Sequence, residues 1–316
     1  MPPVSSSALD FGIYAPQLAF GYADLLHRAH RCEELGFSSL WLFDHLYGPE
    51  LPATPAFEGW TLATALLAQT TSLRVGHLVL CNGFRHPALL AKMATSLDVI
   101  SGGRLDLGIG SGSYEPEHRR AGMAWGSFAE RSERLGESLE ILTRMFASEL
   151  TTFEGEHYQL HDMPNVPQPV QSPRPPIHVG GAGERQTLPL VARYADVWNI
   201  PTYALGELDR KRDVLLAECE KIGRDPASIR MSVEAVLVTA ADDESFAAAM
   251  AKAERRFPGP GWGLHEGGYL GTPNAIVDRI GTHVDAGFTS FIFFTHDRAA
   301  DATLELLATD VLPHFT

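Results

Sequence analysis

The chain has 316 residues, 45% of them hydrophobic and 20% charged, with a formal net charge of −14. This length and balance suit a single α/β barrel with a large core, whereas the negative charge argues against a surface for nucleic acid or anionic membranes. No apolar run reaches the roughly 18 residues of a membrane helix, and residues 1–7 lack the basic and apolar segments of a secretory signal. We therefore expect a cytoplasmic protein.

Metal and disulfide chemistry are not expected. Cys32, Cys81 and Cys219 are far apart and form no CxxC pair, and the 13 histidines include no HExxH motif. The predicted partner is a small-molecule substrate, with no metal.

Short apolar stretches alternate with longer helical patterns along the whole chain, which predicts β–α–β units and a parallel sheet. The expected strands are residues 11–14, 39–43, 74–80, 105–109, 177–179, 196–200, 230–239 and 290–294. The expected helices cover about 22–35, 60–70, 88–100, 128–147, a segment ending near 194, 206–222, 243–256, 273–286 and a last segment reaching about 311. Eight strands alternating with helices predict a (β/α)8 TIM barrel, with strands that read as continuous apolar runs.

We interpret residues 1–316 as one barrel domain with insertions near 112–127, 151–175 and 257–271. The second insertion begins with a predicted hairpin at 151–159 and continues in a proline-rich run. Residues 35–43 resemble residues 286–294, since both read as helix end, glycine cap, aromatic residue and strand. Equivalent units near both ends of the chain favour a closed barrel over an open sheet.

In such a barrel the active site lies at the carboxyl ends of the strands. The residues at these positions are Tyr14, Pro16, Asp44, His45, Cys81, Asn82, Arg85, Gly110, Ser111, Gly112, Ser113, Gly180, Gly181, Gly183, Asn199, Glu234, Thr295 and His296.

Asp44 and His45 directly follow an apolar strand. An imidazole there can donate or accept a proton near neutral pH, and the adjacent carboxylate can hydrogen-bond a ligand. The structural alternative is a helix-start cap followed by a surface histidine.

Two glycine-rich segments follow predicted strands. In Gly180-Gly181-Ala182-Gly183-Glu184-Arg185 the glycines let the backbone approach an anion, N–H groups at the helix start favour phosphate, and Arg185 could add a charge. The alternative is a tight turn without a ligand. Residues 108–112 lack the immediate helix of a dinucleotide fold, since no clear helix begins before about 128, and instead offer backbone against which a flat ligand could lie.

Several motifs occur in the order found in one enzyme superfamily. They cover residues 35–45, 57–61, 74–112, 153–158, 175–185, 192–199 and 271–273. Together they resemble the luciferase-like monooxygenase superfamily, and within it the bacterial oxidoreductases that use the deazaflavin coenzyme F420.

The resemblance implies a barrel with a deazaflavin ring over the strand ends and a non-proline cis peptide behind the ring, near Leu78-Val79. Asp44 corresponds to a residue near the deazaflavin, and His45 to a proton donor or substrate contact. The implied cofactor contacts are Leu78, Val79, Cys81, Asn82, Gly110, Ser111, Gly112 and Ser113 at the ring, with Gly180, Gly181, Ala182, Gly183 and Arg185 at the phosphate. Tyr14, Trp125 and Trp262 are expected in the substrate pocket.

One position departs from the family pattern. Some deazaflavin dehydrogenases carry a glutamate shortly after the glycines of the fourth strand, where this chain has Ser113, with Glu115 and Glu117 beyond. We therefore expect a reductase that takes hydride from reduced F420 and passes it to a small organic substrate.

Two alternatives stay open. One is an FMN-dependent monooxygenase that uses O₂ and reduced flavin from a separate reductase, and the other is a non-catalytic barrel that binds a flavin or deazaflavin. The resemblance also implies a homodimer.

Overall fold

The computed structural model describes residues 9–315, so the prediction for residues 1–7 lies outside the described part of the chain. Eight parallel strands form a closed barrel in which β1 pairs with both β2 and β12, and β10 pairs with both β9 and β12. The barrel strands are β1 (Asp10–Tyr14), β2 (Ser39–Leu42), β3 (Arg74–His77), β5 (Leu105–Gly110), β8 (Ile177–Gly180), β9 (Val197–Pro201), β10 (Arg230–Thr239) and β12 (Phe288–Thr295). The predicted TIM-barrel fold is confirmed.

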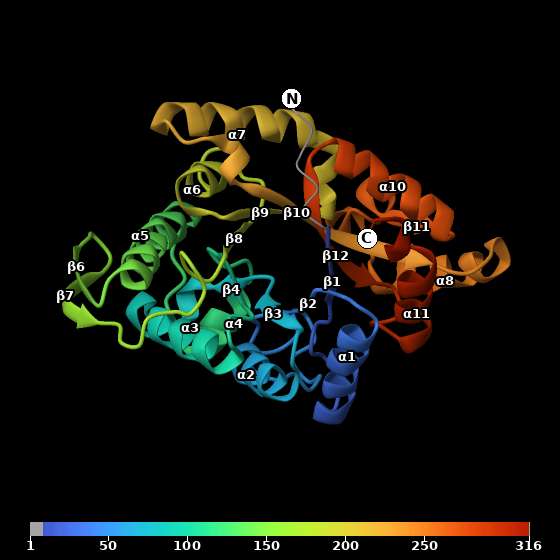
Figure 1. Cartoon of the computed structure of the whole chain (residues 1–316), viewed down its shortest axis with the longest axis horizontal. Helices are drawn as coiled ribbons and strands as arrows, with labels where there is room; N and C mark the ends of the chain where they lie inside the picture. Colours follow the sequence, from blue (N-terminus) through green and yellow to red (C-terminus); the bar gives the residue numbers. More distant parts are fainter. Residues whose placement is uncertain (1–8, 316) are drawn as a thin grey trace.

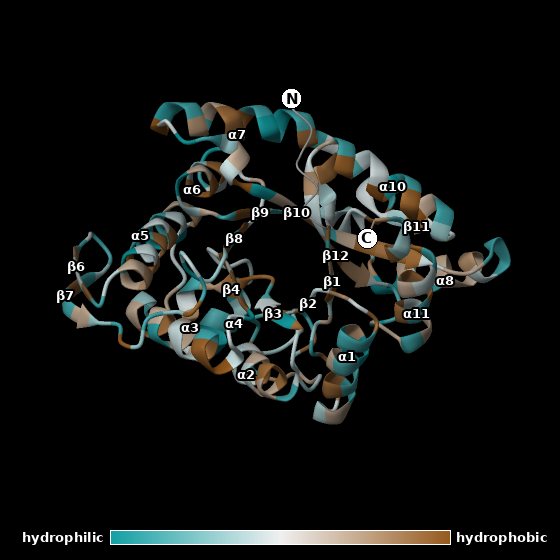
Figure 2. Ribbon diagram, in the orientation of Figure 1, coloured by the Kyte–Doolittle hydropathy of each residue, from teal (hydrophilic) through white to brown (hydrophobic). Residues whose placement is uncertain are grey.

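Helices surround the strands (Figure 1). They are α1 (Tyr22–Glu34), α2 (Gly59–Gln69), α3 (Pro87–Ser101), α5 (Phe128–Ala147), α6 (Thr187–Tyr194), α7 (Leu208–Ile222), α8 (Asp243–Arg256), α10 (Pro273–Asp285) and α11 (Asp301–Asp310). Figure 2 shows polar and apolar residues side by side on these helices, the pattern of helices with one face on the sheet and one in solvent. No helix among residues 9–315 has the length and apolar character needed to cross a membrane.

The two repeated units end their helices as predicted. After α1 and α10, Gly36 and Gly287 take the left-handed conformation, with φ of 81° and 97°. Glycine enters this region without the steric penalty of a Cβ atom, so it turns the chain sharply into the next strand.

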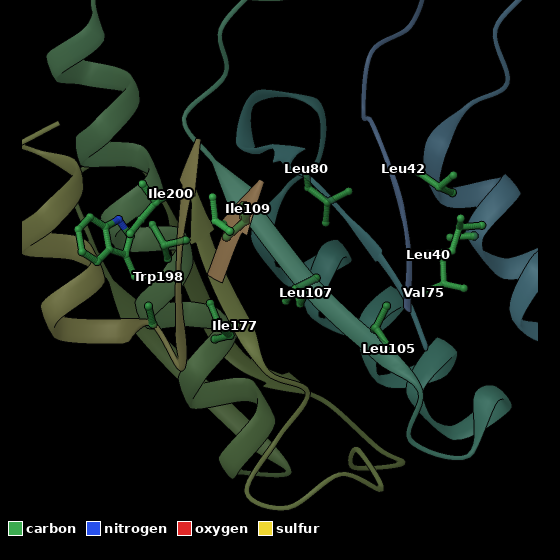
Figure 3. Packing of buried hydrophobic residues seen from close by; sticks show 14 of the residues in the cluster. Leu40, Leu42, Val75, Leu80, Leu105, Leu107, Ile109, Ile177, Trp198 and Ile200 are labelled. Carbon is green, nitrogen blue, oxygen red and sulfur yellow. The ribbon is translucent and has the colours of Figure 1, made fainter. Parts of the chain in front are cut away.

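The barrel strands are buried on both faces, but the two faces differ in chemistry. On β5, Leu105, Leu107 and Ile109 share one face (Figure 3) and belong to the main apolar cluster, which includes residues of the surrounding helices. Because side chains alternate along a strand, Asp106 and Gly110 lie on the opposite face, toward the barrel axis. The expectation of continuous apolar strands is therefore wrong for the inner face.

Charged groups fill the amino-terminal end of the barrel. Arg74 donates from Nε and Nη2 to the two carboxylate oxygens of Asp106, both at 2.8 Å, and His178 Nε2 lies 3.3 Å from Asp106 Oδ1. Although burial opposes ionisation, the hydrogen bond to His178 and the Arg74 charge hold the pKa of Asp106 well below its ordinary value. This charged cluster therefore lies at the end of the barrel opposite the carboxyl ends of the strands.

The third strand is not continuous as predicted. Pairing of β3 with β5 stops after Gly76, a cis peptide joins Leu78 to Val79, and β4 (Leu80–Cys81) then resumes pairing with β5. The non-proline cis peptide expected at Leu78-Val79 is therefore present.

The three segments expected as insertions contain regular structure. A short helix α4 (Glu115–Ala121) follows β5, where we expected no helix before residue 128. It escaped prediction because its buried residues, Glu117 and His118, are both polar, so it has no apolar periodicity.

The predicted hairpin is present as β6 (Leu150–Glu154) and β7 (Gln159–Pro164), antiparallel and outside the ring of helices beside α5 (Figure 1). The third segment holds α9 (Leu264–Gly267) and β11 (Tyr269–Gly271), which pairs with the end of β10. Short 3₁₀ turns cover Asn82–Phe84, Thr202–Glu207, Pro226–Ser228, Pro260–Trp262 and Leu312–His314.

Candidate active site

A cavity of about 460 Å³ opens at the carboxyl ends of the barrel strands. It brings together most of the predicted site residues, namely Asp44, His45, Leu78, Val79, Cys81, Gly110, Ser111, Gly112, Ser113, Gly180, Gly181, Ala182 and Gly183. Its remaining lining residues are Phe43, Leu80, Glu117, Phe128, Thr187, Asn199, Pro201, Tyr203 and Glu234.

Two predicted cofactor residues are not among the lining residues. Asn82 is buried in the 3₁₀ turn after β4, and Arg185 is exposed to solvent at the start of α6.

The three aromatic residues expected in the substrate pocket are also not among the lining residues. Tyr14 and Trp262 both pack against Phe294, with ring centroids 4.9 and 5.9 Å away. Trp125 lies beside Gly112 and under the Arg131 guanidinium, which is 3.7 Å from its ring centroid. Trp125 therefore backs the cavity wall at Gly112, whereas Tyr14 and Trp262 pack around Phe294, which does not line the cavity.

His45 is held by a buried carboxylate. Its Nδ1 lies 2.8 Å from Oε1 of Glu117, whose exposed fraction is 2%, and Glu117 Oε2 accepts the Leu46 N–H at 3.0 Å. A carboxylate can only accept, so Nδ1 carries the proton and Nε2 is left for a ligand in the cavity.

Sequence reasoning placed Glu117 beyond the family glutamate and did not count it as a site residue. The expectation that this carboxylate is missing is therefore wrong, because Glu117 of α4 supplies it. A glutamate four positions after Ser113 was the available signal, but without the helix nothing indicated that it turns back to the imidazole.

Asp44 is not free to bind a ligand with both oxygens. Arg85 donates to its two carboxylate oxygens at 2.7 and 2.9 Å, and the Cys81 N–H donates to Oδ2 at 2.8 Å. Arg85 also contacts Glu58 at 2.6 Å. Asp44 therefore fixes the chain after β4 against the end of β2, which holds the cis peptide segment in place.

Glycines let the chain after β3 enter the barrel. A Cβ on Gly110 would lie 2.8 Å from Val79 Cγ2, and one on Gly180 would lie 2.9 Å from Val79 Cγ1. A Cβ on Gly108 would lie 2.0 Å from the His77 carbonyl oxygen. These glycines thus make room for Val79 to form a flat apolar floor, on which an aromatic ring system can lie.

The Gly180–Gly183 loop offers unused donors. Gly181 donates its N–H to the Asn199 carbonyl at 3.0 Å, whereas the N–H groups of Ala182 and Gly183 have no backbone acceptor among residues 9–315. They lie a few residues before α6, whose amino-terminal end adds partial positive charge. The loop can therefore bind a phosphate through its backbone. The Arg185 side chain, predicted to add a positive charge there, is exposed to solvent and does not line the cavity.

Glu234 is the carboxyl group that sequence reasoning noted at a strand end but left out of the site. It lies on β10, lines the cavity, and has no hydrogen bond from the described part of the chain to its side chain. Burial raises the pKa of Glu234 to about 7. A single carboxyl group inside an otherwise apolar strand, residues 233–238, was the signal that could have identified it.

Comparison with known proteins places this geometry in a family. A family model for luciferase-like monooxygenases matches residues 5–276. An F420-dependent glucose-6-phosphate dehydrogenase of Amycolatopsis mediterranei is 33% identical over 195 residues, 59% of this chain and 54% of the relative. This chain thus spans about half the length of that curated relative.

An F420-dependent hydroxymycolic acid dehydrogenase of Mycobacterium tuberculosis is 26% identical over 344 residues, covering 99% of this chain and 90% of the relative. The solved structure of a coenzyme F420-dependent tetrahydromethanopterin reductase from Methanopyrus kandleri superposes with a TM-score of 0.79 at 17% identity, covering 98% of this chain and 100% of that one. At this identity the likeness establishes the fold. The match to more than half of the chain shows the family: the chain belongs to the luciferase-like monooxygenase family.

Proposed function

We propose that the protein is an F420-dependent oxidoreductase that transfers hydride between the deazaflavin and a small organic substrate. The observation that carries the proposal is the His45–Glu117 pair, which faces the same cavity as the flat floor of Val79 and its glycines. The names of the two curated relatives support F420 as the cofactor.

The residues present fit this cofactor. The segment around Leu78 and Val79 would back the ring, Gly110 to Ser113 would lie along its edge, and the free N–H groups of Ala182 and Gly183 would hold the phosphate. When bound, F420 supplies the hydride donor or acceptor at C5 of its ring. The protein supplies orientation, a water-poor wall and a proton.

His45 is the proposed proton donor. Glu117 fixes its tautomer and ring orientation through Nδ1, so that Nε2 can pass a proton to or from a substrate atom in the cavity. Glu117 acts through the imidazole and is therefore a positioning residue.

We also propose the reductase direction. Reduction of a C=O or C=N bond consumes a hydride and a proton, and the His45 imidazole, held by Glu117 at the cavity, can supply that proton. The earlier ground for this direction, a missing carboxylate at Ser113, no longer applies because Glu117 supplies one.

Replacing His45 by Ala tests the proposal. Turnover of F420 should fall by at least about 10²-fold, while the affinity for F420, measured by fluorescence titration, should change little. Unchanged turnover would remove His45 from the mechanism. Oxygen consumption with reduced FMN would support the monooxygenase alternative, and tight cofactor binding without turnover of any acceptor would support a carrier. The homodimer and the cytoplasmic location stay predictions.

A further inference from the structure

The charges that line the cavity are unevenly distributed. Among the lining residues, all within the described chain, there is no Lys and no Arg, whereas three carboxyl groups are present. Asp44 is neutralised by Arg85 behind the wall, and Glu117 is paired with His45. Of the three, Glu234 is the carboxyl group whose side chain has neither an ion pair nor a hydrogen bond with any group in residues 9–315.

The surroundings of Glu234 contain no compensating charge. Its neighbours in register are Pro201 on β9 and Ile292 on β12. The titratable groups that feel its charge are Tyr14 of β1 and Tyr203 of the turn after β9. For both, burial and then the nearby Glu234 charge raise the phenol pKa. An ionised Glu234 would therefore attract a cation and repel an anion at this wall of the cavity.

A phosphorylated substrate fits poorly in the part of the cavity around Glu234. Proteins hold phosphate esters with Arg or Lys side chains or with clusters of backbone N–H groups. The only such cluster described above, at Ala182 and Gly183, lies after β8, two strands from Glu234, and is assigned to the cofactor phosphate. The substrate end thus differs from what a glucose-6-phosphate dehydrogenase needs.

We infer, resting on the proposed function, that the substrate carries a positively charged nitrogen, either in the protonated C=N bond that is reduced to an amine or in an ammonium group beside the reducible bond, and that Glu234 binds this nitrogen. Sugar phosphates and carboxylates are excluded from the same place. The contact is a charge-assisted hydrogen bond from N–H to the Glu234 carboxylate, in a wall lined by no Lys or Arg side chain.

Three aromatic probes of similar size and different charge, together with glucose 6-phosphate, test the inference. Binding of benzylammonium, benzyl alcohol, benzoate and glucose 6-phosphate to the full-length protein is measured by calorimetry at pH 8, with and without F420. We expect benzylammonium to bind at least about tenfold more tightly than benzyl alcohol, and benzoate and glucose 6-phosphate to show no saturable binding.

The Glu234→Gln variant should remove the advantage of benzylammonium and leave benzyl alcohol within about twofold, while Glu266→Gln, on the solvent-exposed part of α9, should keep the wild-type ranking. In the wild type alone, the advantage should shrink between pH 8 and pH 5.5 as Glu234 becomes protonated. Benzoate or glucose 6-phosphate binding as tightly as benzylammonium would overturn the inference, as would a ranking that Glu234→Gln leaves unchanged.

The two proposals fail separately. Absence of F420 binding with the probe ranking intact would refute the proposed function and not the charge preference. F420 binding with a reversed probe ranking would refute only the present inference.

Discussion

Glu234 should make the protein less stable as the pH rises, and replacing it by Gln should remove this dependence. Burial raises the pKa of this carboxyl from 4.5 to about 7 in the folded chain. Between these two values the folded state keeps a proton that the unfolded state has released. Raising the pH through this window therefore lowers the free energy of unfolding, and the loss is complete above about pH 7.

The size of the effect follows from the two pKa values. Each pH unit within the window lowers the free energy of unfolding by about 1.36 kcal/mol. The raised pKa of Glu234 therefore lowers the free energy of unfolding by about 1 kcal/mol at pH 5 and by about 3 kcal/mol at pH 8. Gln has nearly the same shape and stays neutral, so Glu234→Gln should exceed the wild type in stability by these amounts.

Urea unfolding followed by circular dichroism at pH 5, 6, 7 and 8 measures this difference. Glu266→Gln is the matched control, because it removes a solvent-exposed carboxyl and should change stability by less than about 0.5 kcal/mol at every pH. A Glu234→Gln variant with the same advantage at pH 5 and pH 8, or one less stable than the wild type at pH 8, would refute the reasoning that this carboxyl is partly buried and has no partner.

Three further changes test other parts of the site. Gly110→Ala would place a Cβ 2.8 Å from Val79 and disturb the floor, so F420 affinity should fall about tenfold. Gly206→Ala, whose Cβ would meet no atom within 4 Å, should leave the affinity unchanged. Equal affinities for both variants in a fluorescence titration would contradict the assigned floor. Arg85→Ala leaves the buried Asp44 carboxylate without its partner and should lower the free energy of unfolding in urea by about 3–5 kcal/mol. A loss below about 1 kcal/mol would mean that the ion pair is not buried as described. Glu117→Gln should lower turnover about 10²-fold and shift its pH profile while F420 affinity holds, and a profile that keeps its shape would argue against a positioning role.

The barrel was predictable because the residues of its outer core follow hydrophobic patterns that are local in the sequence. Short continuous apolar runs, alternating with longer segments whose apolar residues recur at spacings of three and four, correctly indicated all eight barrel strands. The predicted bounds agree with the structure for α5, α8 and β10. Inward-facing residues carry no such pattern, which is why the polar inner face of β5 was read as apolar.

The site was predictable in outline and not in its pairings. Strand-end positions identified His45 and the glycine loops, and resemblance to a family located the cis peptide, for which the apolar run in residues 75–80 gives no local signal. The partner of His45 comes from 72 positions along the chain, on a helix too short and too polar to be recognised. Likewise, whether Glu234 has a charged partner depends on residues of three neighbouring strands, and no sequence motif indicates it.

The most direct test of the central claim is a binding titration of the purified protein with F420 and FMN side by side, under anaerobic conditions, followed by fluorescence of each ligand. The account predicts saturable, one-site binding of F420 and at least about tenfold weaker binding of FMN, with F420 binding weakened by Gly110→Ala. Tighter binding of FMN than of F420 would contradict it.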